Sequence, residues 1–168
     1  SGMMSMNGTP ESGPVKMPVA FIDVLAAHHL KEGLLLALLK RQENVIGTTV
    51  SVSLYDAAVS SLINQASNYL MTGKVPQRIG SLHPNIAPYG EIFQTKDEQL
   101  ITFAIGSNAH FVKLCTFLGL EELIQDPKFN DNPSRVVNRT ILFELLENKI
   151  ISFHADEILT VMLEQKVP

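Results

Sequence analysis

The apolar residues of this chain are most densely placed between positions 19 and 42. A short run over residues 19–25 contains one acid, Asp23, and leads into residues 26–42, where leucines would occupy nearly every side of a helix. Because a helix that is apolar all round is normally buried on most sides, the pattern predicts an interior helix over residues 26–42. Residues 1–20, rich in Gly, Ser, Pro and Met, have no clear period and predict an extended or loop segment.

A strand and a second helix are predicted next. Residues 49–54 alternate strictly between apolar and polar positions, which is typical of a strand. A helical period follows over residues 56–70, and Gly73 could end that helix in a left-handed conformation. Helix, strand and helix in this order indicate an α/β layer. Residues 73–90 then form a long loop with three prolines, and loops of that length are usually functional or inter-domain.

The second half of the chain predicts an antiparallel hairpin. Residues 91–95 and 100–105 are apolar runs on either side of a polar turn at 96–99. With helices on both sides of it in the sequence, this half is α+β. We therefore divide the chain into an α/β segment over residues 1–72 and a small α+β domain over residues 73–168.

Three helices are predicted after the hairpin. They are expected over residues 109–118, 135–150 and 155–165. Ser107 or Asn108 could cap the first of them, and Gly119 could close it. The single cysteine, Cys115, falls on the apolar face of that helix, which predicts a buried structural thiol and not a nucleophile.

Composition narrows the class of protein. The formal net charge is −4 and the 13 basic residues are scattered, which argues against nucleic acid or an anionic membrane as the ligand. No apolar stretch is long enough to span a membrane, no export signal is seen, and one cysteine allows no internal disulfide. We expect a cytoplasmic protein. Charged residues make up only 18% of the chain, so some apolar surface should be covered by a partner or a further segment.

Asp23 is the most informative polar residue. An acid between an apolar run and a helix has two interpretations. It could be an N-cap or first-turn acid that satisfies free backbone N–H groups. It could instead be a partly desolvated nucleophile or acid-base group held near a helix N-terminus. The residues alone leave both open.

The histidines predict no metal site. His28 and His29 are adjacent, so on a helix their side chains would point roughly 100° apart, which is poor spacing for two ligands of one ion. Nucleophile-elbow and phosphate-binding glycine motifs are absent from the sequence. The glycine-bearing loop from Gly80 to Asn85 could be mobile and cover a site.

Several stretches together resemble one family, the class III (CaiB/BaiF-type, formyl-CoA transferase-like) coenzyme A transferases. The stretch over residues 18–23 resembles that family's nucleophile segment, with Asp23 as the nucleophile, and residues 80–90 are its most specific match. The other similar stretches are residues 1–8, 36–41, 50–57, 126–129 and 135–139, in the same order and spacing. Asp97-Glu98 in the hairpin replaces the usual Asp-Gly.

The resemblance implies a covalent mechanism. The carboxylate of Asp23 would attack an acyl-CoA thioester, and the mixed anhydride would be opened by coenzyme A to give an aspartyl-CoA thioester. An acceptor carboxylic acid would then collect the coenzyme A. Substrate binding is implied for Gly80, Ser81, His83 and Pro84, in a loop that closes over the intermediate and excludes water.

The resemblance also implies the ligands, the oligomeric state and the part of the family's fold that this chain covers. The ligand would be coenzyme A as acyl-CoA, with no metal, and the family forms interlocked homodimers. Most of its nucleotide-binding residues would lie upstream of this chain, so we expect an internal fragment, from the large α/β domain into the small one, that is inactive alone. Where family members usually have Thr-Gly or Gly-Gly after the nucleophile, this chain has Ala26-Ala27 and then His28-His29.

Two other functions are considered. An acyl-CoA racemase of the same family would need a glutamate near Asn108, and an amide cannot serve as a base, which disfavours racemisation. A non-catalytic, degenerate paralogue or interaction module is the other alternative, favoured by His28-His29 and by the missing nucleotide-binding part.

Overall fold

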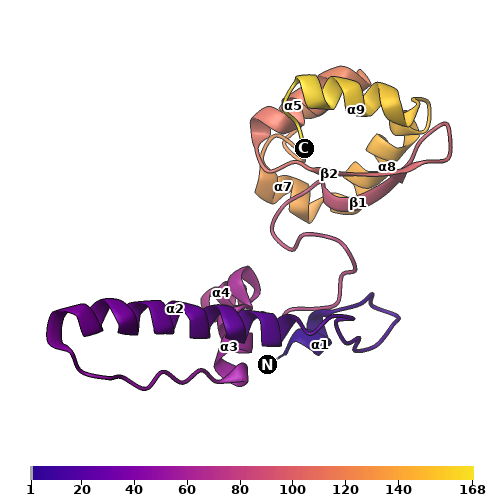
Figure 1. Ribbon diagram of the computed structural model, residues 1–168. Coiled ribbons are helices and arrows are strands. Elements are labelled where there is room, and N and C mark those ends of the chain that lie inside the picture. The colour runs from indigo at the N-terminus through magenta and orange to yellow at the C-terminus, as the bar shows by residue number, and fades with distance from the viewer. Residues whose placement is uncertain (1) are drawn as a thin grey trace. The chain divides into compact units, whose positions relative to one another are not determined.

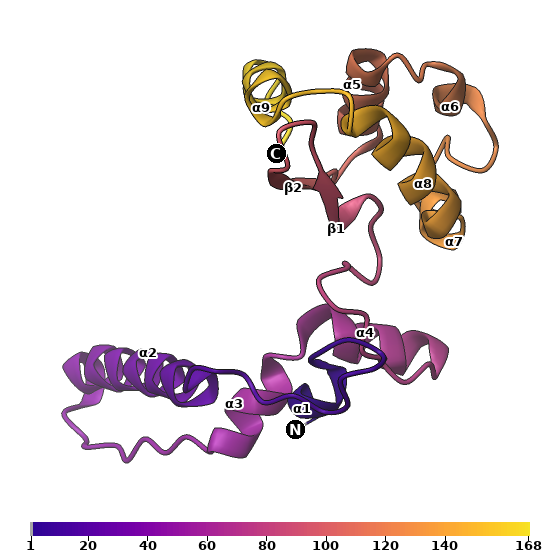
Figure 2. The same ribbon diagram turned by 90° about the vertical axis from the view of Figure 1, so that its right-hand side faces the viewer.

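A computed structural model describes residues 2–168, which divide into two compact units. Unit 1 is Ser1–Gly80 and unit 2 is Ser81–Pro168. Figures 1 and 2 show both units from two directions. The division expected at residue 72 stays a prediction. Among the described residues, no helix is both long and apolar enough to cross a membrane.

Unit 1 consists of helices and connecting segments. The helices are α1 (Met3–Met6), α2 (Phe21–Asn44), α3 (Leu54–Ser60) and α4 (Ile63–Thr72). Helix α3 begins where the Ser53 hydroxyl accepts the backbone N–H groups of Tyr55 and Asp56. Helix α4 ends at Gly73 with φ 71°, the left-handed cap that the sequence predicted.

Three features of unit 1 differ from prediction. The single helix expected over 56–70 is two helices, because Ile63 has φ 47°, which lies outside the right-handed helical range. The segment predicted to be extended contains the short helix α1. Helix α2 begins at Phe21, five residues before the predicted start, so that Asp23 lies inside its first turn.

The prediction that the leucine-rich helix is buried is wrong for unit 1. Only Ala26 of α2 is buried, and Leu36, for example, is 67% exposed. The element that packs against α2 is α3, which covers one side of a helix that is apolar on all sides. The apolar pattern therefore predicted the helix correctly and its burial incorrectly, because burial depends on neighbours that unit 1 does not supply.

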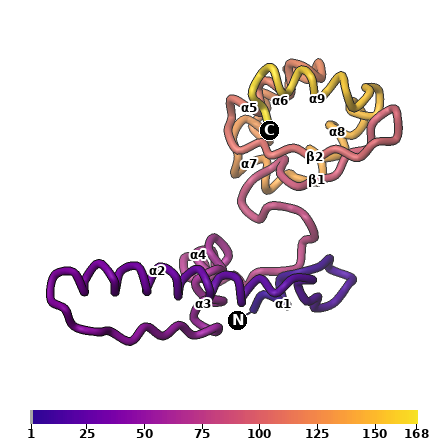
Figure 3. Tube along the Cα trace, in the orientation of Figure 1, coloured from indigo at the N-terminus to yellow at the C-terminus, as the bar shows by residue number. Residues whose placement is uncertain are grey.

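The strand predicted over residues 49–54 is not formed. The segment from residue 45 to 53 runs back beside α2 without a strand partner, as the trace in Figure 3 shows. Val50 packs against α2 at Gly33, where an added Cβ would lie 2.6 Å from the Val50 Cγ1 atom. Alternation predicts a strand only where a second strand can complete the hydrogen bonds. Here the apolar side chain of Val50 contacts helix α2 instead of a strand.

Unit 2 contains the predicted hairpin. Strand β1 (Tyr89–Gln94) pairs antiparallel with β2 (Leu100–Ala104), with a register irregularity between Tyr89 and Ile92. In the turn, Glu98 has φ 60°, the conformation that glycine would adopt most easily. Within residues 2–168 this hairpin is the only sheet.

Five helices complete unit 2, which is mostly helical. They are α5 (Asn108–Leu118), α6 (Glu122–Gln125), α7 (Asn132–Val137), α8 (Arg139–Ile150) and α9 (Ala155–Glu164). Ser107 caps α5 by accepting the His110 N–H, and Gly119 ends it with φ 65°, both as predicted. The helix expected over 135–150 instead begins in α7 and is interrupted at Asn138, whose backbone is not helical.

One apolar core holds unit 2 together. The inner face of the hairpin contributes Phe93 and Phe103, whose rings are 5.7 Å apart, and Phe143 of α8 stacks on Phe93. Helices α5, α8 and α9 contribute the fully buried side chains Leu114, Leu146 and Ile158. The C-terminal segment closes the core, because Pro168 accepts the backbone N–H of Ala104 at the edge of β2.

Candidate functional site

Asp23 lies in the first turn of α2, with an exposed carboxylate. The helix is preceded by Ala20, which offers no side-chain cap. Across the described residues, Asp23 makes no side-chain hydrogen bond and no ion pair. The N-terminus of a helix favours a negative charge, because its backbone N–H groups point outward. The carboxylate is thus a first-turn acid that is not used to cap the backbone.

A cavity of about 500 Å³ lies beside Asp23 in unit 1. Its walls are residues 16–22, which lead into α2, and the side chains of Met3 and Met4 from α1. The α1 helix, which the sequence did not predict, therefore supplies one side of the space next to the acid. A carboxylate at the edge of a largely apolar cavity is available to a ligand that enters it.

His28 and His29 are exposed and have different neighbours. The His28 Nδ1 atom is 3.0 Å from the Lys31 ammonium. The His29 Nδ1 atom is 3.8 Å from a Glu32 carboxylate oxygen, and its Nε2 atom is 3.5 Å from the Ser60 hydroxyl. Between Gly2 and Pro168, no group of three or more potential metal-binding side chains is gathered at one point.

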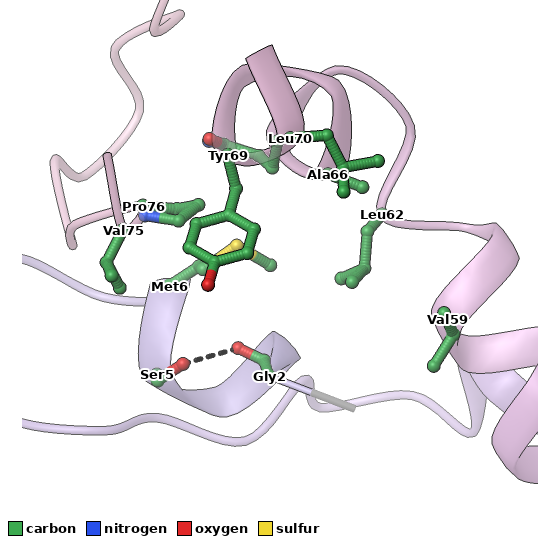
Figure 4. Close-up of a pocket in the computed structure, with 11 residues that line it drawn as sticks. Gly2, Ser5, Met6, Val59, Leu62, Ala66, Tyr69, Leu70, Val75 and Pro76 are labelled. Carbon is green, nitrogen blue, oxygen red and sulfur yellow. Dashed lines mark hydrogen bonds between the residues drawn. The ribbon is translucent and has the colours of Figure 1, made fainter. Parts of the chain in front are cut away.

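A second cavity in unit 1, of about 450 Å³, is apolar. Figure 4 shows the Tyr69 ring of α4 beside Met6 of α1 and Pro76, with Leu62 on the opposite wall. Ser5 does not offer its hydroxyl to this cavity, because that group donates to the Gly2 carbonyl oxygen at 2.6 Å. The cavity has few polar groups with which to orient a ligand.

Gly80 ends unit 1 in a left-handed conformation with φ 65°. Its backbone N–H donates to the Gly8 carbonyl oxygen at 2.9 Å, and an added Cβ would come within 3.8 Å of Thr9. Nearby, the Arg78 guanidinium donates to the Ser5 carbonyl oxygen at 3.2 Å. Gly80 is thereby tied to the N-terminal segment.

The predicted binding residues Ser81, His83 and Pro84 belong to unit 2. The Ser81 hydroxyl donates to the carbonyl oxygen of Gly90 at 2.5 Å. Gly90 has φ 89°, and an added Cβ there would lie 1.9 Å from the Ser81 carbonyl oxygen. Only glycine allows the two ends of this loop to approach so closely. Pro84 is half-buried within the loop.

His83 is held by contacts on both its backbone and its ring. Its N–H donates to the Tyr89 carbonyl oxygen at 2.8 Å, and its ring lies 4.9 Å from the Tyr89 ring. The Nδ1 atom accepts the backbone N–H of Asn85 at 3.1 Å. Burial, together with the positive charge of Arg139, lowers the pKa of His83 below its usual value. The imidazole is therefore predominantly neutral at pH 7.

Two arginines, Arg135 and Arg139, hold the backbone of this loop, and we call them the arginine pair. The Nη2 group of Arg139 donates to the carbonyl oxygens of His83 at 2.6 Å and Ile86 at 2.7 Å. Its Nη1 atom forms an ion pair with Glu91 at 3.1 Å, and the side chain of Glu91 is 4% exposed. Glu91 also accepts the backbone N–H of Tyr89.

Arg135 is fully buried and has no carboxylate partner among the described residues. It donates to the carbonyl oxygens of Ala87 and Phe129, both at 2.9 Å, and to the Asn108 side-chain oxygen at 2.8 Å. The guanidinium carbon also lies 4.4 Å from the centre of the Phe111 ring. Burial lowers the pKa of Arg135, but a guanidinium stays charged in proteins.

Sequence reasoning did not identify the arginine pair. Residues 135–139 carry a family resemblance, and the spacing of four residues places both arginines in the single helix predicted over residues 135–150. That spacing was a usable signal, because residues four apart share a face. The spacing does not reveal that both side chains donate hydrogen bonds to carbonyl oxygens of a loop some fifty positions earlier.

Cys115 is the buried structural thiol that was predicted. Its side chain is inaccessible, and desolvation raises the pKa of the thiol to about 12. It therefore stays protonated at neutral pH.

Comparison with known proteins gives a consistent result across the whole chain. The family model described as CoA-transferase family III matches residues 1–168. The chain is 31% identical over 168 residues to the succinate–glutarate CoA-transferase of Agrobacterium fabrum, covering 100% of the chain and 42% of that protein. It is 30% identical to the acetyl-CoA:oxalate CoA-transferase of Acetobacter aceti, covering 100% of the chain and 43% of that protein.

Solved structures agree with this result. The crystal structure of a CAIB/BAIF family protein from Brucella suis is 36% identical with a TM-score of 0.71, and the match covers 99% of this chain and 44% of that one. The structure of Rv3272 from Mycobacterium tuberculosis gives a TM-score of 0.80 at 28% identity, with 99% and 42% covered. The chain thus spans less than half of the length of these relatives.

Proposed function

Because the chain belongs to CoA-transferase family III, we propose that the whole protein transfers coenzyme A from an acyl-CoA to a carboxylic acid, with Asp23 as the covalent carrier. The observation that supports this role most directly is the unpaired, uncapped carboxylate at the N-terminus of α2 beside a cavity. An aspartate at the N-cap would instead accept hydrogen bonds from the free backbone N–H groups of the first turn.

The proposed reaction proceeds through two exchanges at Asp23. Its carboxylate attacks the thioester carbonyl carbon, the carbon–sulfur bond breaks, and the coenzyme A thiolate leaves a mixed anhydride. The thiolate then attacks the aspartyl carbonyl carbon, which releases the first acid and forms an aspartyl-CoA thioester. An acceptor carboxylate repeats these steps in reverse and restores Asp23. A carboxylate is ionised at neutral pH and needs no base for the attack.

Gly80, Ser81, His83 and Pro84 are proposed to bind the substrate. The well-defined backbone of residues 83–87, held by the arginine pair, supports a positioning function for this loop. We further propose that the complete protein works as a cytoplasmic homodimer, with acyl-CoA and a carboxylic acid as its ligands and no metal. The 168-residue chain alone should turn over nothing, and normal transferase rates from it would overturn that expectation.

Racemisation is less well supported. The racemase alternative requires a base near Asn108, and the Asn108 side-chain oxygen accepts a hydrogen bond from the buried Arg135. This contact favours a structural role for Asn108, in α5, and leaves the coenzyme A transfer at Asp23 as the better-supported reaction.

Trapping tests the proposed carrier. The full-length protein would be incubated with succinyl-CoA and hydroxylamine, and its peptides analysed by mass spectrometry. We expect a hydroxamate at Asp23, because hydroxylamine captures both the anhydride and the thioester. Asp56→Asn is a matched control, since Asp56 is a first-turn acid of α3, and it should leave labelling intact. An active protein with Asp23 unlabelled would contradict the assignment.

A further inference from the structure

We infer that His83 presents a neutral Nε2–H donor to a carbonyl or carboxylate oxygen of the substrate, and that Arg139 is the residue that positions it. This inference rests on the proposed function, and it adds a protonation state, a tautomer and a class of ligand atom to a residue otherwise proposed only to bind.

The tautomer follows from one hydrogen bond. The Nδ1 atom of His83 lies 3.1 Å from the backbone nitrogen of Asn85. A backbone N–H can only donate, so Nδ1 must offer its lone pair. In a neutral imidazole the proton is then on Nε2. An imidazolium would point its Nδ1–H at the Asn85 N–H, so this arrangement also disfavours the cation.

The ring has one polar atom left for a ligand. No hydrogen bond from Nε2 to any of residues 2–168 is formed, and the His83 side chain is partly exposed. The contact with the Tyr89 ring and the bond from Asn85 restrict rotation of the imidazole. Nε2–H is therefore a fixed donor at a partly desolvated surface, which is the arrangement that stabilises charge on an oxygen most effectively.

Arg139 fixes the main chain that carries this ring. It bonds the His83 carbonyl oxygen directly and the Ile86 carbonyl oxygen beyond it, on both sides of Asn85. Glu91 pairs with the same guanidinium and also accepts the Tyr89 N–H. Tyr89 is thus linked to Arg139 through Glu91. Asn85 lies between the two residues whose carbonyl oxygens Arg139 binds, and its own carbonyl oxygen accepts the Asn132 side-chain amide at 2.7 Å.

The neutral Nε2–H of His83 limits which atoms of the substrate it can bind. A neutral N–H donor suits the acyl carbonyl oxygen of a thioester or anhydride, where negative charge develops, and one oxygen of an acceptor carboxylate. A cation at this position would also bind the negative ground state of a free acid strongly, which reduces the discrimination between that ground state and the transition state.

The tautomer is tested first, without any need for activity. Long-range ¹H–¹⁵N correlation spectra of the 168-residue chain at pH 7 would be recorded, with the His83 signals assigned by His83→Gln. We expect a protonated Nε2 and an unprotonated Nδ1. A proton on Nδ1, or an imidazolium, overturns the inference. Arg139→Lys should broaden or shift these signals, while the exposed Lys149→Arg on the same helix should not.

The binding function is tested in the full-length enzyme with a matched pair. The glutamine amide nitrogen can occupy the place of Nε2, whereas the asparagine amide nitrogen falls near Nδ1. We expect His83→Asn to lose about 100-fold in kcat/KM, and His83→Gln to retain at least ten times more activity than His83→Asn. Equal melting temperatures for the two variants show that both fold.

These outcomes separate the two proposals. If Asp23 is labelled by hydroxylamine but His83→Gln and His83→Asn are equally impaired, the donor function of Nε2 is refuted while coenzyme A transfer stands. If wild-type protein never labels Asp23, the proposed function fails and with it the substrate assignment, whatever the tautomer. If Arg139→Lys leaves the His83 signals and kcat unchanged, Arg139 has no positioning role.

Discussion

The two units of this chain differ in how they bury apolar side chains. Unit 2 encloses phenylalanines, leucines and isoleucines from a hairpin and four helices in one core. Among residues 2–80, the buried side chains are the three alanines Ala26, Ala57 and Ala58, and most leucines of α2 are exposed. The most apolar segment of the sequence is thus in the unit with the smaller core.

The unit with the larger core is not the unit that carries the proposed covalent carrier. A contiguous exposed apolar surface in a protein usually marks an interaction site, so α2 is a surface that requires contacts from outside unit 1. Asp23, the proposed covalent carrier, lies at the N-terminus of that same helix. The residues of the proposed binding loop in unit 2 are held by internal hydrogen bonds instead. The proposed carrier therefore lies on a helix whose apolar surface is exposed, whereas the proposed binding loop is held by hydrogen bonds within unit 2.

Separating the units should give the largest effect. A polypeptide of residues 81–168 should unfold cooperatively in urea, with an m-value of about 1 kcal/mol/M, because its core is complete. A polypeptide of residues 1–80 should show helical circular dichroism without a cooperative transition. The measurement is urea titration followed by far- and near-ultraviolet circular dichroism. A cooperative urea transition in residues 1–80 would show that unit 1 also has a complete core, so that the two units do not differ in this respect.

Removing the buried guanidinium should be the next largest effect. Arg135→Met leaves the carbonyl oxygens of Ala87 and Phe129 without donors, and each unsatisfied buried acceptor costs about 1–3 kcal/mol. We expect the free energy of unfolding to fall by about 3 kcal/mol, measured from urea curves of the whole chain. Lys149→Ala, on an exposed part of α8, should change it by less than about 0.5 kcal/mol.

Substituting one glycine in each unit tests the difference in stability between the units further. Gly90→Ala would place a Cβ against the Ser81 carbonyl in a backbone with φ 89°, and should destabilise unit 2 by about 2–3 kcal/mol. Gly73 has a similar φ of 71° but no atom within 4 Å of an added Cβ. Because Gly73 belongs to unit 1, Gly73→Ala should leave the main urea transition unmoved. A shift of that transition by Gly73→Ala would show that the units unfold together.

The smallest expected effect is a pH dependence confined to unit 2. The thiol of Cys115 has a usual pKa of 9.0, raised to about 12 by burial in the folded state. Between these values the unfolded chain loses the proton that the folded chain keeps, so stability falls as pH rises above 9. From pH 8 to pH 10 wild type should lose about 1 kcal/mol more than Cys115→Ala. Equal losses would show that Cys115 is accessible to solvent.

Local signals in the sequence predicted much of the fold. The hairpin, the Ser107 cap and the glycine ends of α4 and α5 were all predicted, because each depends on residues close in sequence. Residues 49–54 and α2 were misjudged for the opposite reason. A strand needs a partner strand and burial needs neighbours, and neither is encoded in the segment itself.

The candidate site was predictable only in part. Asp23 could be identified because an acid within an apolar run is conspicuous, but its position inside the helix depended on where α2 begins. The tautomer of His83 depends on a turn of two residues, and the arginine pair depends on packing between a loop and α7 and α8. Such contacts between distant segments leave no periodic trace in the sequence.

Arg135 is a permanent cation surrounded by carbonyl dipoles and an aromatic face, and no carboxylate within residues 2–168 forms an ion pair with it. Backbone carbonyls neither titrate nor undergo deamidation or exchange with dissolved ions. The attachment at Ala87 is therefore made through a neutral acceptor, whereas the guanidinium of Arg139 also forms an ion pair with Glu91. The loop thus has one attachment that involves neutral acceptors alone and one that includes an ion pair.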